Sequence, residues 1–131
     1  MRAILIILFI CAAFIPQSEP QTIQINGIKE KITIRRDERG IPYIEAQNDE
    51  DLFFGQGYAT AQDRLSQMDF MRRTARGELA EVLGAGPGNV VLDQDKLHRT
   101  YGFIQGAEVE YAGLSPRSRT LLEAYARGVN A

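Results

Sequence analysis

One stretch decides the fold of this chain: residues 48–75 read NDEDLFFGQGYATAQDRLSQMDFMRRTA. Asn48 is a good helix N-cap, and the three acids after it lie where the helix dipole favours negative charge. At about 100° per residue, the apolar side chains fall on two roughly opposite faces. One face holds Phe54, Tyr58, Ala61, Leu65, Met68 and Ala75, and the other holds Leu52, Ala59 and Phe70. A helix that is apolar on two sides usually lies between packed layers, so the stretch predicts a long helix sandwiched by its neighbours.

Residues 22–46, which precede this helix, have the two-residue periodicity of β-strands. Asn26-Gly27 is a strong hairpin-turn signal, residues 37–40 make a second turn, and residues 41–44 return as a short strand. Pro42 cannot donate to a ladder, so that strand lies at an edge or begins there. The pattern is carried by Ile23, Ile25, Ile28, Ile32, Ile34, Ile41 and Ile44. We therefore expect three short strands before the helix.

After the long helix the pattern is again helical. Gly77 interrupts it, and Ser115-Pro116 is a clean N-cap and N1 pair that opens a last helix. That helix places Leu121, Leu122, Tyr125, Ala126 and Val129 on or near one face. Between these points lie one or two turns at 78–83, a glycine-rich loop at 84–88, and weaker helices at 90–101 and 103–112. Strands followed mainly by helices predict an α+β fold. The last helix shows no stop signal before Ala131, which indicates an incomplete domain.

The first twenty residues have the proportions of a secretory signal peptide. A positive start, Met1-Arg2, precedes an apolar run at 3–15 and a polar stretch at 16–20. A membrane-spanning helix needs about 20 apolar residues, so the run is short for an anchor, which remains the alternative. We expect residues 1–20 to be the signal and 21–131 the exported part, so that Cys11 leaves with the signal. A secreted or periplasmic bacterial protein is predicted.

The composition excludes several other classes. A hydrophobic share of 44% is too high for a disordered chain. A net charge of -2 and a pI of about 5.4 give no basic footprint for nucleic acid. A single cysteine excludes a disulfide framework and a cysteine-based zinc site within the chain.

No self-contained active site is visible, and no residue is assigned as catalytic, cofactor-binding or metal-ligating. His98, the only histidine, is predicted to be a solvated surface residue on a charged helix. Asp93-x-Asp95 begins like a calcium loop but lacks the glycine at position six. Gly55-Gln56-Gly57 is a broken dinucleotide fingerprint inside a helix, so its small residues are better explained by close helix packing. None of the four serines lies in a Gly-x-Ser-x-Gly elbow: Ser18, Ser66, Ser115 and Ser118.

Asp63 and Arg64 stand out for electrostatic reasons. As neighbours on a helix they point apart, and neither meets an opposite charge three or four residues away. An unpaired charge that faces a packed layer is costly. We therefore expect the pair to form a structural clamp to another segment, and we expect Asp63→Ala to block folding and maturation.

Four ordered blocks of the chain resemble the penicillin acylase family. They are IRRDERGIPYIEA at 34–46, GQGYATAQDRLSQM at 55–68, RRTARGELAEVLG at 72–84 and LEAYARGVNA at 122–131. The resemblance covers about residues 30–131. Tyr43 departs from the histidine that is more usual after that proline, which we interpret as a packing variant.

The resemblance implies a secreted N-terminal-nucleophile (Ntn) amidohydrolase with a four-layer αββα fold, of which this chain is the N-terminal segment of the α-chain. Such enzymes are made as a precursor, and removal of a spacer frees a serine at the N-terminus of the β-chain. That serine attacks the amide carbonyl with its own α-amino group as the base, while backbone N–H groups and an asparagine hold the oxyanion. The family's nucleophile, oxyanion hole, acyl pocket and calcium ligands lie beyond Ala131.

The resemblance also implies partners. These are the chain's own β-chain and a small acyl-amide substrate, such as a β-lactam antibiotic, an N-acyl homoserine lactone or another acylated amine. Calcium is implied only for the full-length enzyme. The alternative is a complete small exported helical module that binds a partner and catalyses nothing. The unstopped last helix and the partnerless Asp63 and Arg64 favour the acylase.

Overall fold

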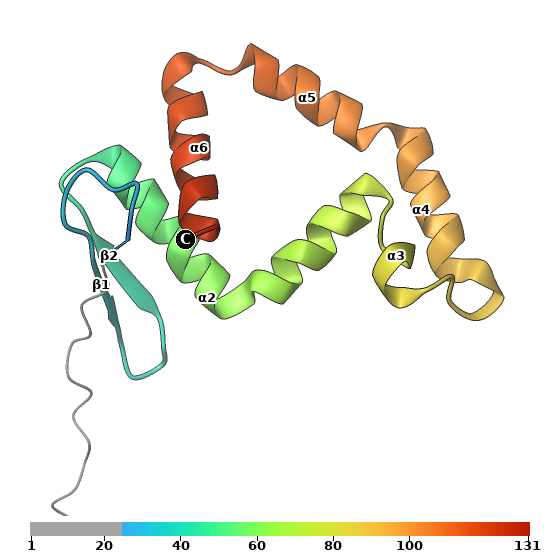
Figure 1. Cartoon of the computed structure of the whole chain (residues 1–131), viewed down its shortest axis with the longest axis horizontal. Coiled ribbons are helices and arrows are strands. Elements are labelled where there is room, and N and C mark those ends of the chain that lie inside the picture. Colours follow the sequence, from blue (N-terminus) through green and yellow to red (C-terminus); the bar gives the residue numbers. More distant parts are fainter. Residues whose placement is uncertain (1–24) are drawn as a thin grey trace, which may run out of the picture.

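The computed structural model describes residues 25–131, and it begins with a two-stranded antiparallel hairpin (Figure 1). Strand β1 (Thr33–Arg36) pairs with β2 (Pro42–Glu45), with Ile34 opposite Ile44. Pro42 is the first residue of its strand, as its missing N–H requires. In the intervening turn, Asp37 Oδ1 accepts from the backbone N–H of Ile41 at 2.8 Å.

The hairpin is shorter than the periodicity predicted. The expected strand around Ile23 lies mostly outside the described residues, and Asn26-Gly27 does form a turn. The next strand begins only at Thr33, so Ile28 and Ile32, which the periodicity assigned to strands, lie before it. The reason is that the backbone N–H groups of residues 29 and 30 donate to a carboxylate of the long helix rather than to a neighbouring strand.

Helix α2 (Asp49–Arg76) begins and ends as expected. The Asn48 side chain accepts from the N–H of Asp51 at 2.9 Å, and Gly77 closes the helix in the left-handed conformation with φ of 64°. The helix is not continuous, however, because Arg64 has φ of -141° and ψ of 21°, and Figure 1 shows α2 changing direction near its middle. Neither Pro nor Gly marks this break. The nearby Thr60 hydroxyl donates to the Gln56 carbonyl, a contact that bends helices.

The core lies where the N-terminal half of α2 crosses helix α6 (Pro116–Val129). A Cβ atom on Gly57 would lie 2.1 Å from the Tyr125 carbonyl oxygen, and one on Gly128 would lie 2.0 Å from the Phe54 carbonyl oxygen. Both distances are far inside van der Waals contact. Glycine at both positions therefore lets the two helix backbones touch, and the predicted close helix packing at Gly57 is confirmed.

The hairpin packs on another side of the same half-helix. A Cβ atom on Gly55 would lie 2.8 Å from Ile44 and 3.0 Å from Ile32. Gly55 thus makes room for the hairpin and Gly57 makes room for α6. The sandwiched helix expected from the sequence is confirmed for this half of α2. Its second half leaves Leu65 and Phe70 exposed on the surface of residues 25–131.

The packed face of α6 differs from the predicted one. Ser115 caps the helix as expected, accepting from the N–H of Ser118 at 3.1 Å. The buried residues are Ala124 and Gly128, whereas Leu122 is 51% exposed. The helix also ends at Val129, where Asn130 Nδ2 donates to the Ala126 carbonyl at 2.7 Å. Val129 lies only two residues before Ala131, so the expected helix without a stop signal stays a prediction.

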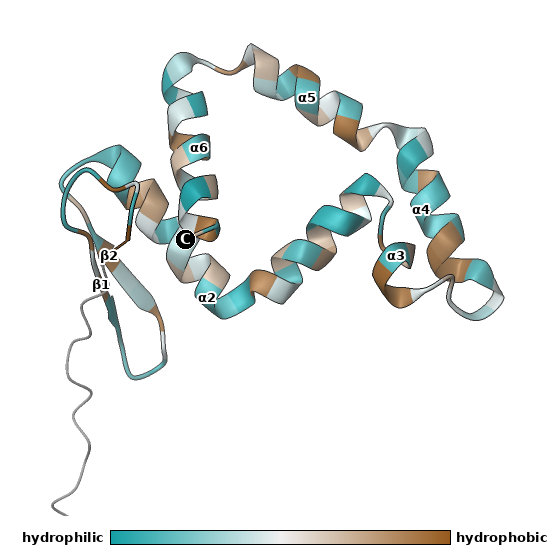
Figure 2. Ribbon diagram, in the orientation of Figure 1, coloured by the Kyte–Doolittle hydropathy of each residue, from teal (hydrophilic) through white to brown (hydrophobic). Residues whose placement is uncertain are grey.

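The other helices form an open frame that joins the second half of α2 to α6 (Figure 1). They are α3 (Ala80–Leu83), the 3-10 turn η1 (Pro87–Asn89), α4 (Val90–Tyr101) and α5 (Phe103–Gly113). Hydrophobic residues lie along α3, α4 and α5 in Figure 2, and Val82, Tyr101 and Val109 are at least half exposed. Within the part of the chain that the structure describes, these helices bury little apolar surface.

The glycine crossing makes a direct prediction. Gly57→Ala and Gly128→Ala each force the helices apart, and each should lower the free energy of unfolding by at least about 2 kcal/mol in urea denaturation. Gly106→Ala is the matched control, because a Cβ atom there meets nothing within 4 Å in helix α5. That variant should be stabilised by about 0.5 kcal/mol. Equal effects in the three variants would show that the crossing is not tight.

Candidate functional site

The N-terminus of α2 carries a buried carboxylate, Asp51, with only 2% of its surface exposed. Its oxygens accept from the backbone N–H of Lys29 at 2.9 Å, the N–H of Glu30 at 2.8 Å and the Asn48 side-chain amide at 2.7 Å. Burial alone raises the pKa of this carboxyl, but the three hydrogen bonds together outweigh burial and hold its pKa below the ordinary value. Asp51 therefore stays ionised and anchors the loop that leads into β1.

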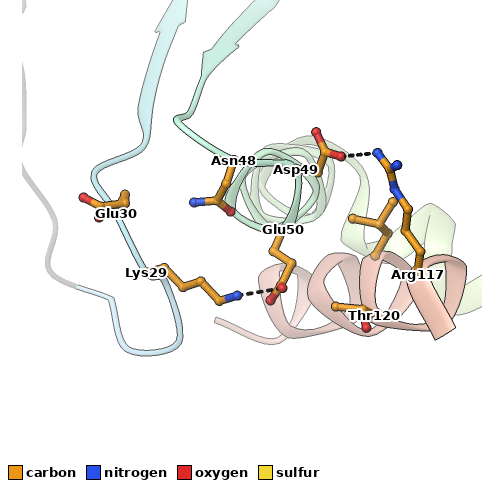
Figure 3. A pocket seen from close by; sticks show the side chains of 8 residues that line it. Lys29, Glu30, Asn48, Asp49, Glu50, Arg117 and Thr120 are labelled. Carbon is orange, nitrogen blue, oxygen red and sulfur yellow. Dashed lines mark hydrogen bonds and ion pairs between the residues drawn. The ribbon is translucent and has the colours of Figure 1, made fainter.

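Beside this anchor lies an open cavity of about 480 Å³ between the loop at 29–30, the start of α2 and helix α6 (Figure 3). Four of its charged side chains form two ion pairs: Lys29 Nζ lies 2.7 Å from Glu50 Oε1, and Arg117 Nη2 lies 2.6 Å from Asp49 Oδ2. The Thr120 hydroxyl, also in the lining, donates to a carbonyl of its own helix. The Arg117–Asp49 pair thus joins α6 to α2. The lining of the cavity presents no nucleophile next to a base.

A second polar cluster lies where α4 meets the end of α2. Asp95, only 5% exposed, accepts from the N–H groups of Leu79 at 3.1 Å and Ala80 at 2.7 Å, and so caps α3. Arg99 Nε donates to the Gly77 carbonyl at 2.8 Å. In the sequence, Asp95 belongs only to a pattern that begins like a calcium loop. Its partners are backbone groups, which no side-chain motif reveals.

His98 belongs to the same cluster, and its prediction as a solvated residue was wrong. The side chain is half-buried, with Nδ1 bonded to the Thr74 carbonyl and Nε2 2.7 Å from Gln94 Nε2. Because a carbonyl can only accept, Nδ1 carries the proton and Nε2 accepts from the amide. The ring also meets Phe103 edge-on at 5.5 Å. The Nδ1 bond therefore holds α2 against α4, while the Nε2 bond to Gln94 lies within α4.

The predicted clamp at Asp63 is confirmed. Arg36 Nη1 of strand β1 donates to Asp63 Oδ2 at 2.9 Å and to the Gly40 carbonyl at 2.9 Å, which joins the hairpin to α2 just before its break. The side chains of Arg36 and Asp63 are 32% and 40% exposed. An exposed pair of this kind contributes about 1 kcal/mol or less. For Arg64 the structure shows no polar side-chain partner among residues 25–131.

Neither a metal site nor a membrane-spanning helix is found in the described part of the chain. Among residues 25–131, no three histidine, cysteine or acidic side chains gather closely enough to hold a metal ion. None of the helices within those residues is long and apolar enough to cross a membrane. Ser18, like the predicted signal peptide, lies outside the described residues.

The Asp51 anchor predicts a specific response to mutation. Asp51→Asn replaces one carboxylate oxygen, which accepts from a backbone N–H, with an NH2 group that can only donate. The free energy of unfolding should therefore fall by about 1–3 kcal/mol at pH 7 in urea denaturation. Asp49→Asn is the control, because that side chain is 57% exposed in the same helical turn. Equal losses in the two variants would contradict the anchoring role.

The same carboxylate predicts a pH dependence. Since folding lowers the pKa of Asp51, the unfolded chain binds the proton first as the pH falls. The stabilisation is therefore complete above the ordinary pKa of an aspartate and is lost at lower pH, below about pH 4. The stability difference between the wild type and Asp51→Asn should shrink between pH 6 and about pH 3. A constant difference over that range would contradict the assignment.

A double-mutant cycle on Arg36→Ala and Asp63→Ala tests the clamp. Because the pair is partly exposed, we expect a coupling free energy of about 0.5–1 kcal/mol that weakens with added salt. This expectation replaces the complete block of folding predicted from the sequence. A zero coupling at low salt, measured by thermal or urea unfolding, would show that the clamp does not form.

Comparison with known proteins now gives the family. The family described as Penicillin amidase matches residues 31–131. The chain is 44% identical over 107 residues to an acyl-homoserine lactone acylase, QuiP, of Pseudomonas aeruginosa, and 44% identical over 101 residues to a penicillin G acylase of Escherichia coli. These alignments cover 82% and 77% of the chain. The chain spans only 12% of the length of either relative.

A solved structure agrees with these matches. The thermostable penicillin G acylase from Alcaligenes faecalis superposes with a TM-score of 0.70 at 36% identity, covering 76% of this chain and 51% of that chain. The predicted fold class is confirmed: an α+β arrangement, two strands and then mainly helices, that forms the N-terminal segment of an αββα Ntn-hydrolase fold. With the family match over residues 31–131, these similarities show that the chain belongs to the penicillin amidase family.

Proposed function

We propose that this chain is the N-terminal part of the α-chain of a secreted acylase that hydrolyses the amide bond of an acyl side chain. The observation that supports this most strongly is the family match, which runs through residues 31–131. Residues 1–20 act as the export signal and residues 21–131 begin the α-chain, in a secreted or periplasmic location.

The nucleophile is the serine at the N-terminus of a β-chain further along the polypeptide. Its hydroxyl attacks the amide carbonyl, its α-amino group takes the proton, and the amine leaves before water releases the acyl group. Backbone N–H groups and an asparagine stabilise the oxyanion. The buried carboxylates of the described residues, Asp51 and Asp95, each accept from backbone N–H groups. This is why we assign this part of the chain a scaffolding role.

The substrate is an acylated amine, and two relatives point to different members of that class. The Pseudomonas aeruginosa relative is named for acyl-homoserine lactones and the Escherichia coli relative for penicillin G, at the same 44% identity. The sequence identity over this segment therefore does not indicate which of these two substrates the enzyme prefers. The chain's own β-chain is its partner in the mature enzyme, and the family resemblance implies that the calcium ligands of the full-length enzyme lie beyond Ala131.

The test is an amidase assay of the protein encoded by the complete reading frame. We expect release of the acyl group from at least one of three probes: a phenylacetyl amide, an aliphatic amide or an N-acyl homoserine lactone. We also expect cleavage into two chains, with serine at the N-terminus of the second by Edman sequencing. Alanine in place of that serine should abolish both processing and hydrolysis.

Two outcomes would contradict the proposal. A reading frame that stops at Ala131 would favour the small exported binding module, whose exposed residues on α4 and α5 would then bind a partner protein. A full-length, processed protein that hydrolyses none of the three amides would contradict the acylase activity itself.

A further inference from the structure

Two independent features coincide at Arg64. It is the one residue inside the α-helices of the described chain whose backbone is not helical, so the two halves of α2 diverge at this point (Figure 1). Its neighbour Asp63 is already paired with Arg36 of the hairpin. The break therefore lies next to the Arg36–Asp63 ion pair. The guanidinium of Arg64 takes no part in that pair.

Arg64 is also unusual among the arginines. Every other arginine within residues 25–131 lies within ion-pairing or hydrogen-bonding distance of a carboxylate or a carbonyl oxygen. Arg64 has no such partner in that part of the chain. Its side chain is exposed there, as are those of several apolar neighbours. A guanidinium offers five donors in a planar fork that matches a carboxylate.

The surface next to Arg64 is apolar. In the turns after Arg64, Leu65 is 56% exposed and Met71 is 66% exposed, while Met68, one helical turn after Arg64, is half-buried. We call these three residues and Arg64 the Arg64 surface. The nearest acid on this half of α2, Asp69, is held by Arg72 at 2.7 Å and Arg73 at 2.8 Å. The Arg64 surface thus combines one cation with exposed apolar side chains and has no anion of its own.

We propose that the Arg64 surface docks another segment of the same acylase polypeptide, outside residues 25–131, that carries an Asp or Glu opposite Arg64. Apolar side chains of that segment cover Leu65 and Met71. The inference rests on the proposed function, since the chain spans only 12% of the length of its relatives and most of such an enzyme lies elsewhere. The charge of Arg64 selects an acidic segment, and the flexible Met71 adapts to its shape.

The first test compares arginine variants in the full-length protein. Arg64→Met keeps the length of the side chain and removes its charge, and it should reduce the yield of soluble, processed enzyme by about five-fold or more. Arg64→Lys should retain more of that yield because it keeps the charge. Arg76→Met is the matched control on the same half-helix, since Arg76 is 43% exposed and pairs with Glu78 inside the chain. An equal yield from Arg64→Met and Arg76→Met would overturn the proposal.

The second test identifies the partner. A carbodiimide joins an amine to a carboxylate in contact with it, so the Arg64→Lys variant should be linked at position 64 to an Asp or Glu outside residues 25–131. Peptide mapping of the purified full-length protein reads out the link. A link only within residues 25–131, no link at position 64, or a link to a second copy in a mixture of light and heavy isotope-labelled protein would each contradict the proposal.

The outcomes separate this inference from the proposed function. Amide hydrolysis by the wild type without a link at position 64 would reject the Arg64 contact alone. A link to a downstream carboxylate in a protein that hydrolyses no amide would support the contact and reject the activity.

Discussion

The structure depends on one close contact, the crossing of α2 and α6 through Gly57 and Gly128. At this point the backbone of each helix fills the space that a side chain of the other would need. The hairpin, the first half of α2 and helix α6 are arranged around it. The hairpin packs on Gly55, two residues before Gly57, and the ion pair between Arg117 and Asp49 in Figure 3 joins the starts of the same two helices. A close approach of this kind tolerates no added methyl group.

Buried carboxylates hold the parts that packing does not reach. Asp51 fixes the loop before β1 and Asp95 caps α3, each by accepting two backbone N–H groups from residues at least fifteen positions away. Such contacts satisfy donors that would otherwise be buried without a partner. They give the chain a defined shape although few of its large apolar residues are buried within residues 25–131. This combination is consistent with the scaffolding role proposed for this part of the chain.

The sequence predicted the order of elements, the caps at Asn48 and Ser115, and the packing role of Gly57, because each depends on local residue chemistry. It did not predict the break at Arg64, which no Pro or Gly marks. The hydrophobic pattern did not predict the buried face of α6, because Ala124 and Gly128 are only weakly hydrophobic. These residues are buried because their small size lets α6 pack closely on α2. The role of His98 depended on the carbonyl of Thr74, 24 residues away, which a side-chain pattern cannot reveal.

The central claim is that Gly57 and Gly128 act as a single contact, and a double-mutant cycle on the two glycines measures this directly. Once one alanine has separated the helices, the second should cost little more. The free energy of unfolding of the Gly57→Ala/Gly128→Ala variant should therefore lie close to that of the worse single variant, with a coupling of at least about 1 kcal/mol. Strictly additive losses in urea denaturation would contradict the account, because they would show that the two glycines act at independent places.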